Sequence, residues 1–242
     1  MSRENLTQSL WAIADGIRYV PGALRSSVPL FRGGSTDKGA YFDFDIYVRD
    51  PGYLESVAHW YISAIRSIKE LAKAEGKPGP KVLAYVHKNY ADDAVTVGMA
   101  PLVGLIATHP TVRLPQVAVR LDRELPHDQV KLGGPGTTET VIEDVEVVLM
   151  TDHVSGGEEL LKAILALKRY GAKVNYAITF SIWLDKFDAG FGQSVNAETT
   201  LYYLNSLERE TVDGVEYAIP KPNDELIEKI NQVLDGPEPV VA

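Results

Sequence analysis

Continuous apolar runs, each followed by a helical pattern, dominate the second half of the chain. "VEVVLM" (145–150) precedes a helical pattern over about 157–170, and "AKVNYAITFSIWL" (172–184) follows it. Runs that do not alternate with polar residues indicate strands that are covered on both faces, and the succession of strand, helix and strand indicates that the strands are parallel. The sequence therefore predicts an α/β fold, with a parallel sheet of about five strands flanked by helices.

Other segments of the chain extend this pattern on both sides. A helical stripe runs from Leu54 to Leu71 and ends at "GKPGP" (76–80), which cannot continue a helix. Further strands are predicted at 41–47, 81–86, 94–98 and 115–121, and further helices at 4–17, 100–107, 196–207 and 223–234. Residues 122–138 are polar and rich in glycine, so we expect a loop there.

The composition excludes several classes of function. A formal charge of −9 argues against nucleic acid as the main partner, because neutralising its phosphates requires a basic surface. The chain has no cysteine, and none of its five histidines has the spacing of a zinc site, so we expect no metal-ligating cluster. No run is long enough to span a membrane, and the amino terminus lacks the apolar core of a signal peptide. We therefore expect a cytoplasmic protein that does not bind membranes.

"VVLMTDHVSGGEELLKAI" (147–164) is a candidate anion-binding site. Asp152 is expected at the end of a strand, and Ser155, Gly156 and Gly157 form a turn that leads into a helix. Such a turn directs backbone N–H groups and the positive end of the helix dipole at one point. The alternative is a capping box, in which Ser155 and Glu158 satisfy each other's backbone N–H groups and the glutamate fills the anion site. The pattern alone leaves both interpretations open.

Two further segments have a functional and a structural interpretation. "RLDRELPHDQVKLGG" (120–134) carries several cationic side chains and ends in glycines, as a mobile active-site lid would, but acidic residues between them also fit a solvated loop. "GMAPLVGLIA" (98–107) is a turn that could surround a diphosphate with backbone N–H groups, or simply pack a helix closely on the sheet. The chain has neither a P-loop nor a dinucleotide-binding glycine fingerprint.

These segments together resemble the type I phosphoribosyltransferases, and most closely the orotate phosphoribosyltransferases, over about residues 5–205. "VPLFRGGSTDKGAYFDFD" resembles the amino-terminal segment of that family, "VGMAPLVGLIA" its diphosphate loop and "VAVRLDRELPHDQVKLGG" its catalytic loop. "VEVVLMTDHVSGGEELLKAILALKRYGAKV" resembles its motif for phosphoribosyl diphosphate (PRPP), with the following helix and strand. The resemblance implies a single domain, with an amino-terminal hood (1–50), a core (51–207) and a tail that carries a helix (208–242).

The resemblance also implies an activity: transfer of the phosphoribosyl group from PRPP to a nucleobase, orotate foremost, with Mg²⁺ assisting, diphosphate released and a homodimer as the assembly. By position, Arg123, His127 and Asp152 would be catalytic, the first two stabilising the leaving diphosphate from the lid and Asp152 facing the ribose hydroxyls. The residues that would bind PRPP are Arg32, Arg120, Thr151, Asp152, Ser155, Gly156 and Gly157.

Five positions differ from the family's pattern. Thr151 occupies the position of the first of two adjacent acids, and Glu158 that of a hydroxyl residue. Leu102 occupies the position of a lysine, Leu121 that of a basic residue that often follows the arginine of the catalytic loop, and Ala189 that of the arginine that recognises the carboxylate of orotate. A second function therefore stays open, in which a non-catalytic homologue binds a nucleotide or a partner protein in a regulatory or structural role.

Overall fold

The computed structural model describes residues 51–88, 99–121, 131–133, 142–212 and 215–228. Seven strands in these residues form one sheet with the order β3-β2-β1-β4-β5-β6-β7. The helix predicted at 4–17 and the strands predicted at 41–47 and 94–98 lie outside the described residues, as does the hood as a whole.

The middle of the sheet is parallel and its two edges are antiparallel. β1 pairs with β2 and β4, β4 with β5, and β5 with β6, all in parallel, whereas β3 and β7 pair antiparallel with β2 and β6. The predicted α/β fold is confirmed, although the edge strands were not predicted. The bounds are β1 (Val82–Lys88), β2 (Gln116–Leu121), β3 (Lys131–Gly133), β4 (Glu146–Val154), β5 (Lys173–Ile182), β6 (Thr200–Val212) and β7 (Val215–Pro222).

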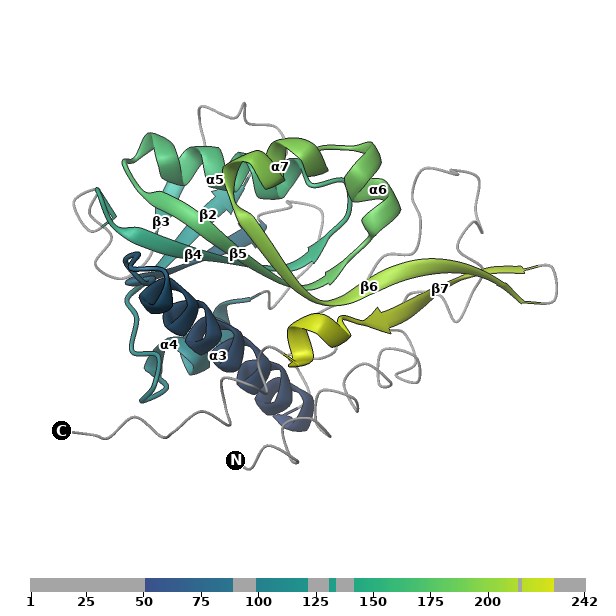
Figure 1. Cartoon of the computed structure of the whole chain (residues 1–242), viewed down its shortest axis with the longest axis horizontal. Coiled ribbons are helices and arrows are strands. Elements are labelled where there is room, and N and C mark those ends of the chain that lie inside the picture. Colours follow the sequence, from purple (N-terminus) through teal and green to yellow (C-terminus); the bar gives the residue numbers. More distant parts are fainter. Residues whose placement is uncertain (1–50, 89–98, 122–130, 134–141, 213–214, 229–242) are drawn as a thin grey trace.

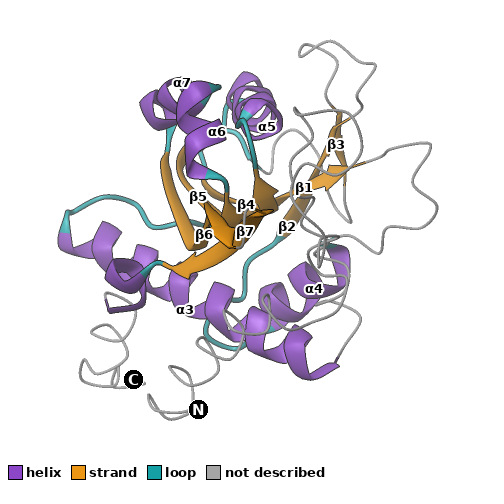
Figure 2. Cartoon of the chain, turned by 90° about the vertical axis from the view of Figure 1, so that its right-hand side faces the viewer, coloured by secondary structure: helices purple, strands orange, loops and turns teal. Residues whose placement is uncertain are grey.

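Helices cover both faces of this sheet, which explains the continuous apolar runs (Figures 1 and 2). α3 and α4 pack on one face in a core that includes Trp60 and Phe180, and α5, α6 and α7 lie over the other face in a second core that includes Leu160 and Ile164. The bounds are α3 (Pro51–Ala74), α4 (Ala100–Thr108), α5 (Glu158–Arg169), α6 (Leu184–Ala189) and α7 (Gly192–Glu198).

The structure corrects two predictions in the second half of the chain. The helix predicted over 196–207 is wrong, because α7 ends at Glu198 and the following β-branched and aromatic residues continue as β6. The loop predicted over 122–138 contains the short strand β3. The helix predicted at 223–234 is present at 224–228, with Leu226 and Ile227 buried in the core beside α3, and its residues from 229 onward lie outside the described residues.

The turn between β4 and α5 is packed against the chain after β5. The backbone N–H of Phe191 donates to the carbonyl of Gly156 at 2.8 Å. Gly157 has a φ of +83°, and a Cβ atom there would lie 3.0 Å from ring carbons of Phe187. Both the backbone conformation and the close approach therefore require glycine at position 157.

Gly157→Ala should lower the free energy of unfolding by about 1–3 kcal/mol, because alanine at positive φ is strained and its methyl group meets the Phe187 ring. Gly104→Ala is the matched control: it lies within α4 with no atom within 4 Å of the added Cβ, and should raise stability by about 0.5–1 kcal/mol. Denaturant unfolding measures both changes. Equal effects of the two substitutions would contradict the packing described for the turn.

Candidate functional site

The helices that follow β1 and β4 leave the sheet toward opposite faces. The chain passes from β1 to α4 on one face and from β4 to α5 on the other, although β1 and β4 are neighbours in the sheet. In an open α/β sheet, this change of direction opens a crevice at the carboxyl ends of the two strands. The candidate site therefore lies at the carboxyl end of β4.

Thr151 and Asp152 belong to β4 itself, which continues to Val154 and does not end at Met150 as predicted. The Thr151 hydroxyl donates to Asp152 Oδ1 at 3.1 Å, and the backbone N–H of His153 donates to the same oxygen at 2.7 Å. Asp152 is half-buried, whereas Thr151 is buried. The carboxylate is thus held in a fixed orientation at the edge of the sheet.

Tyr61, on α3, holds the backbone of β4 in place from the face of the sheet that α3 covers. Its hydroxyl donates to the Thr151 carbonyl at 2.8 Å, and the side chain is fully buried. Burial, and after it the nearby Asp152 carboxylate, raises the pKa of Tyr61 well above its ordinary value, while a backbone hydrogen bond with Phe180 lowers it. Tyr61 therefore acts as a neutral donor that holds the end of β4.

The turn Ser155–Gly157 brings the amino terminus of α5 to this edge. Gly157 is the N-cap residue and no side chain caps the helix, so the capping-box interpretation is wrong. Ser155 is exposed, and Glu158, the first helical residue, forms an ion pair with Lys162 at 2.8 Å. The carboxylate of Glu158 is therefore directed along the helix surface and does not cap the turn.

Of the cationic residues predicted around the site, Arg120 is among the residues that the structure describes. Arg120 lies at the carboxyl end of β2, in register with His87 of β1 and Lys131 of β3, and it is exposed. It is therefore on the same sheet edge as Asp152, with β1 between the two strands. Arg32, Arg123 and His127 lie outside the described residues.

The other positions that differ from the family's pattern are buried or exposed to different extents, and Leu121, at the end of β2, is buried. Leu102 is fully buried in the core beside α3, so its side chain offers no contact to a ligand. Ala189 is exposed at the end of α6. On the same helix, the Lys186 ammonium lies 4.6 Å from the centroid of the buried Trp183 ring, which places a cation beside the carboxyl end of β5.

Three polar residues near the site were not predicted: Tyr61, His153 and Ser181. Tyr61 is part of an apolar helical stripe, so its hydrogen bond depends on tertiary packing that the pattern does not reveal. Ser181 follows Thr179 two residues later in the otherwise apolar end of β5. Polar residues at this spacing share one face of a strand, which is the signal that could have indicated a polar patch there.

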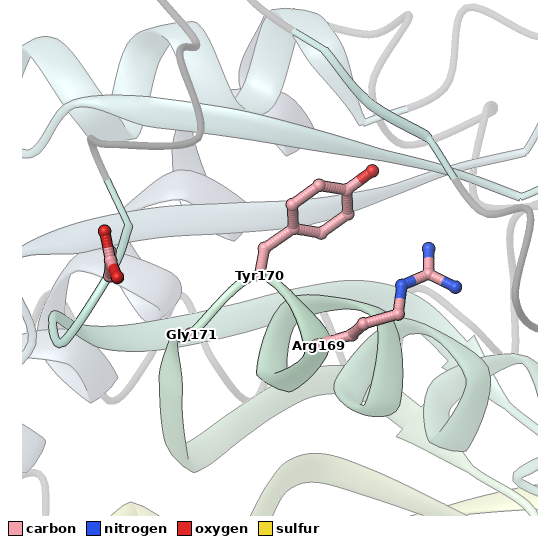
Figure 3. A pocket seen from close by; sticks show the side chains of 4 residues that line it. Arg169, Tyr170 and Gly171 are labelled. Carbon is pink, nitrogen blue, oxygen red and sulfur yellow. The ribbon is translucent and has the colours of Figure 1, made fainter.

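A hollow of about 430 Å³ lies elsewhere on the molecule, lined by Glu143, Arg169, Tyr170 and Gly171 (Figure 3). These residues precede β4 and β5, so the hollow is at the amino ends of the parallel strands and does not coincide with the candidate site. Its charged contacts include the Arg169 guanidinium over the Tyr170 ring at 5.4 Å from the centroid.

Two further findings concern the described residues only. They contain no group of three or more histidine, aspartate or glutamate side chains arranged to hold a metal ion. None of the described helices is long and apolar enough to cross a membrane.

Comparison with known proteins identifies the fold. No family model matches the sequence, and no curated protein does. Among solved structures, the orotate phosphoribosyltransferase from Aeropyrum pernix is similar with a TM-score of 0.54 at 16% identity, covering 91% of this chain and 98% of that one. The orotate phosphoribosyltransferase of Mycobacterium tuberculosis H37Rv in complex with Fe(III) dicitrate is similar with a TM-score of 0.50 at 15% identity, covering 81% and 94%. The chain has the fold of the type I phosphoribosyltransferases.

Proposed function

We propose that the protein transfers the phosphoribosyl group from PRPP to a nucleobase and releases diphosphate. One observation carries this proposal. Asp152, a carboxylate held in a fixed orientation, is followed three residues later by the turn 155–157 and then by the amino terminus of α5. All three lie where the chain leaves neighbouring strands toward opposite faces of the sheet. A sugar phosphate presents both hydroxyl groups and an anion, so a carboxylate and a helix amino terminus at one strand end can bind its two ends.

The residues have distinct roles in this proposal. Asp152 accepts hydrogen bonds from the ribose hydroxyls, and Thr151 supports it from within β4. The turn of Ser155, Gly156 and Gly157 holds the 5′-phosphate with backbone N–H groups and the positive end of the α5 dipole. The ion pair with Lys162 supports this role, because it engages the Glu158 carboxylate on the helix surface.

Charge stabilisation of the leaving diphosphate is assigned to the cationic residues. Arg120 is exposed at the carboxyl end of β2, on the same edge of the sheet as Asp152. Arg32, Arg123 and His127 are proposed from the sequence, with Arg123 and His127 acting from a lid that excludes water when it closes. These groups stabilise negative charge that develops as the bond to diphosphate breaks.

Mg²⁺ fits the donors that the chain provides. Proteins commonly bind this ion through one or two carboxylates together with the phosphates of the substrate, and Asp152 is one such half-buried carboxylate. We therefore propose that the substrate supplies most of the ligands and that the ion, when bound, neutralises charge on the diphosphate.

Orotate is the nucleobase that we propose first, which would place the reaction in pyrimidine nucleotide biosynthesis. The support is the sequence resemblance, together with the position of the Lys186 ammonium beside the carboxyl end of β5, where Ala189 provides no cation. A carboxylate that gains a charge-assisted hydrogen bond there would gain about 1.5–3 kcal/mol. Uracil and the purines are the competing substrates.

Purified protein incubated with Mg²⁺, PRPP and orotate, uracil or adenine should release diphosphate, most rapidly with orotate. Asp152→Asn should lower kcat/KM about 10- to 100-fold, because a neutral amide forms weaker hydrogen bonds with the ribose hydroxyls. Asp144→Asn is the control, since Asp144 precedes β4 at the opposite edge and is exposed. Binding of PRPP without turnover of any base would instead favour the non-catalytic homologue.

Glu158→Thr tests whether the Glu158 carboxylate interferes with the anion site. Loss of this partly exposed ion pair should lower the free energy of unfolding by about 0.3–0.5 kcal/mol, and Lys162→Met should have a similar effect. The stabilisation by Mg²⁺ and PRPP, measured as a thermal shift, should be the same in wild type and Glu158→Thr. A much larger shift in Glu158→Thr would show that the wild-type carboxylate obstructs the phosphate.

We also propose a homodimer, on the resemblance alone. Sedimentation equilibrium of the full chain should give a mass of about twice that of one chain, and addition of PRPP should not change it. A mass of one chain at micromolar concentration would contradict this assembly.

A further inference from the structure

Polar side chains lie in register near the carboxyl ends of β4, β5 and β6. Residues in register across neighbouring parallel strands project to the same face, so they form rows across β4, β5 and β6. The row of Leu149, Ala177 and Leu201 is apolar and belongs to the core. Two residues further along the strands lies the polar row Thr151–Thr179–Tyr203. Two residues beyond it lies the polar row His153–Ser181–Asn205.

The last row contains an incompletely satisfied polar group. His153 Nδ1 and Ser181 Oγ are 2.8 Å apart, and Ser181 and Asn205 are both fully buried. In the part of the chain that the structure describes, neither Nδ2 nor Oδ1 of Asn205 has a hydrogen-bond partner. Buried amides without partners are rare because they lose their hydration and gain nothing in return. Asn205 therefore requires an explanation.

The register limits the partners that Asn205 can reach. On one side it faces Pro222 of β7, which has no backbone N–H to donate. On the other side it is in register with Ser181 of β5, and neighbouring strands lie only about 4.7–4.9 Å apart. A rotation of the Asn205 side chain thus brings its amide within reach of Ser181 Oγ.

We propose that Asn205, Ser181 and His153 form a hydrogen-bond relay that prepares His153 for a ligand at the end of β4. In this relay the Ser181 hydroxyl donates to His153 Nδ1 whether or not a ligand is bound, and Asn205 Nδ2, after that rotation, donates to Ser181 Oγ. The imidazole proton is then on Nε2, the ring nitrogen that faces away from Ser181. His153 becomes a ligand-contact residue beside Asp152, while Ser181 and Asn205 are positioning residues.

The chemistry of the ligand group follows from this tautomer. An imidazole with its proton on Nε2 donates a hydrogen bond, so it recognises an acceptor: a phosphoryl oxygen of the sugar phosphate, or a carbonyl or carboxylate oxygen of the base. His153 is half-buried and is the penultimate residue of β4, directly after Asp152 in the strand. The identity of the ligand rests on the proposed function, whereas the tautomer of His153 does not.

The first test is the tautomer, read from the ¹⁵N chemical shifts of His153 in the full-length protein without ligand. The Nε2–H form should predominate in the wild type and give way to a mixture in Ser181→Ala, whereas Ser181→Thr, which keeps the hydroxyl, should retain it. A wild type that carries its proton on Nδ1, or a Ser181→Ala protein with an unchanged tautomer, would overturn the relay.

The second test compares two buried polar side chains without partners. Asn205→Leu and Thr199→Val both remove such groups, so neither should lower the thermal stability, but only Asn205 is in the row. Calorimetric titration with ribose 5-phosphate, Mg²⁺-PRPP and orotate separately should show about a tenfold loss of affinity in Asn205→Leu and none in Thr199→Val. Loss with ribose 5-phosphate assigns the contact to the sugar phosphate, and loss with orotate alone assigns it to the base.

The two proposals fail in different ways. Equal affinities for Asn205→Leu and wild type, or a wild type that binds none of the three probes, would overturn the contact role of His153. Absence of turnover, with the tautomer and the loss of affinity as expected, would overturn the proposed transferase activity and leave the relay in place.

Discussion

Burial of both faces of the parallel strands determines where this protein can place polar chemistry. α3 and α4 close one face and α5, α6 and α7 the other, so side chains along the middle of each strand are part of a core. Charged and hydrogen-bonding groups can therefore reach solvent only where the strands end. The residues of the candidate site lie at such an end, and the covering helices that restrict polar groups to it also make the apolar runs continuous.

The end of β4 shows how such an edge is kept rigid while remaining polar. Tyr61 supports the Thr151 carbonyl from the α3 side, and the backbone of His153 orients the Asp152 carboxylate. Within β5, the Thr179 hydroxyl donates to the Ser181 carbonyl at 3.0 Å. Each of these groups satisfies another, so the edge is held in place without apolar packing at the point where a ligand would lie.

The sequence predicts the parts of the structure that depend on continuous runs, and fails where tertiary contacts decide. β4, α5 and β5 follow from their apolar patterns, and Asp152 and the turn follow from the position of the strand end. The helix predicted at 196–207 fails because that segment joins the end of α7 to a strand that needs β5 and β7 as partners. The capping box fails because contacts of the turn with Phe187 and Phe191 place the start of α5 at Glu158.

The order of strands also has a consequence for how the sheet is assembled. β4, β5, β6 and β7 follow one another along the chain as neighbours in the sheet, whereas β1 joins β4 only across the chain of residues 89–145. Closing that long loop costs more chain entropy than any other pairing of neighbours in the parallel sheet. The candidate site thus lies where the part of the sheet formed by β1, β2 and β3 meets the part formed by β4 to β7. Its geometry therefore forms only when these two parts have paired.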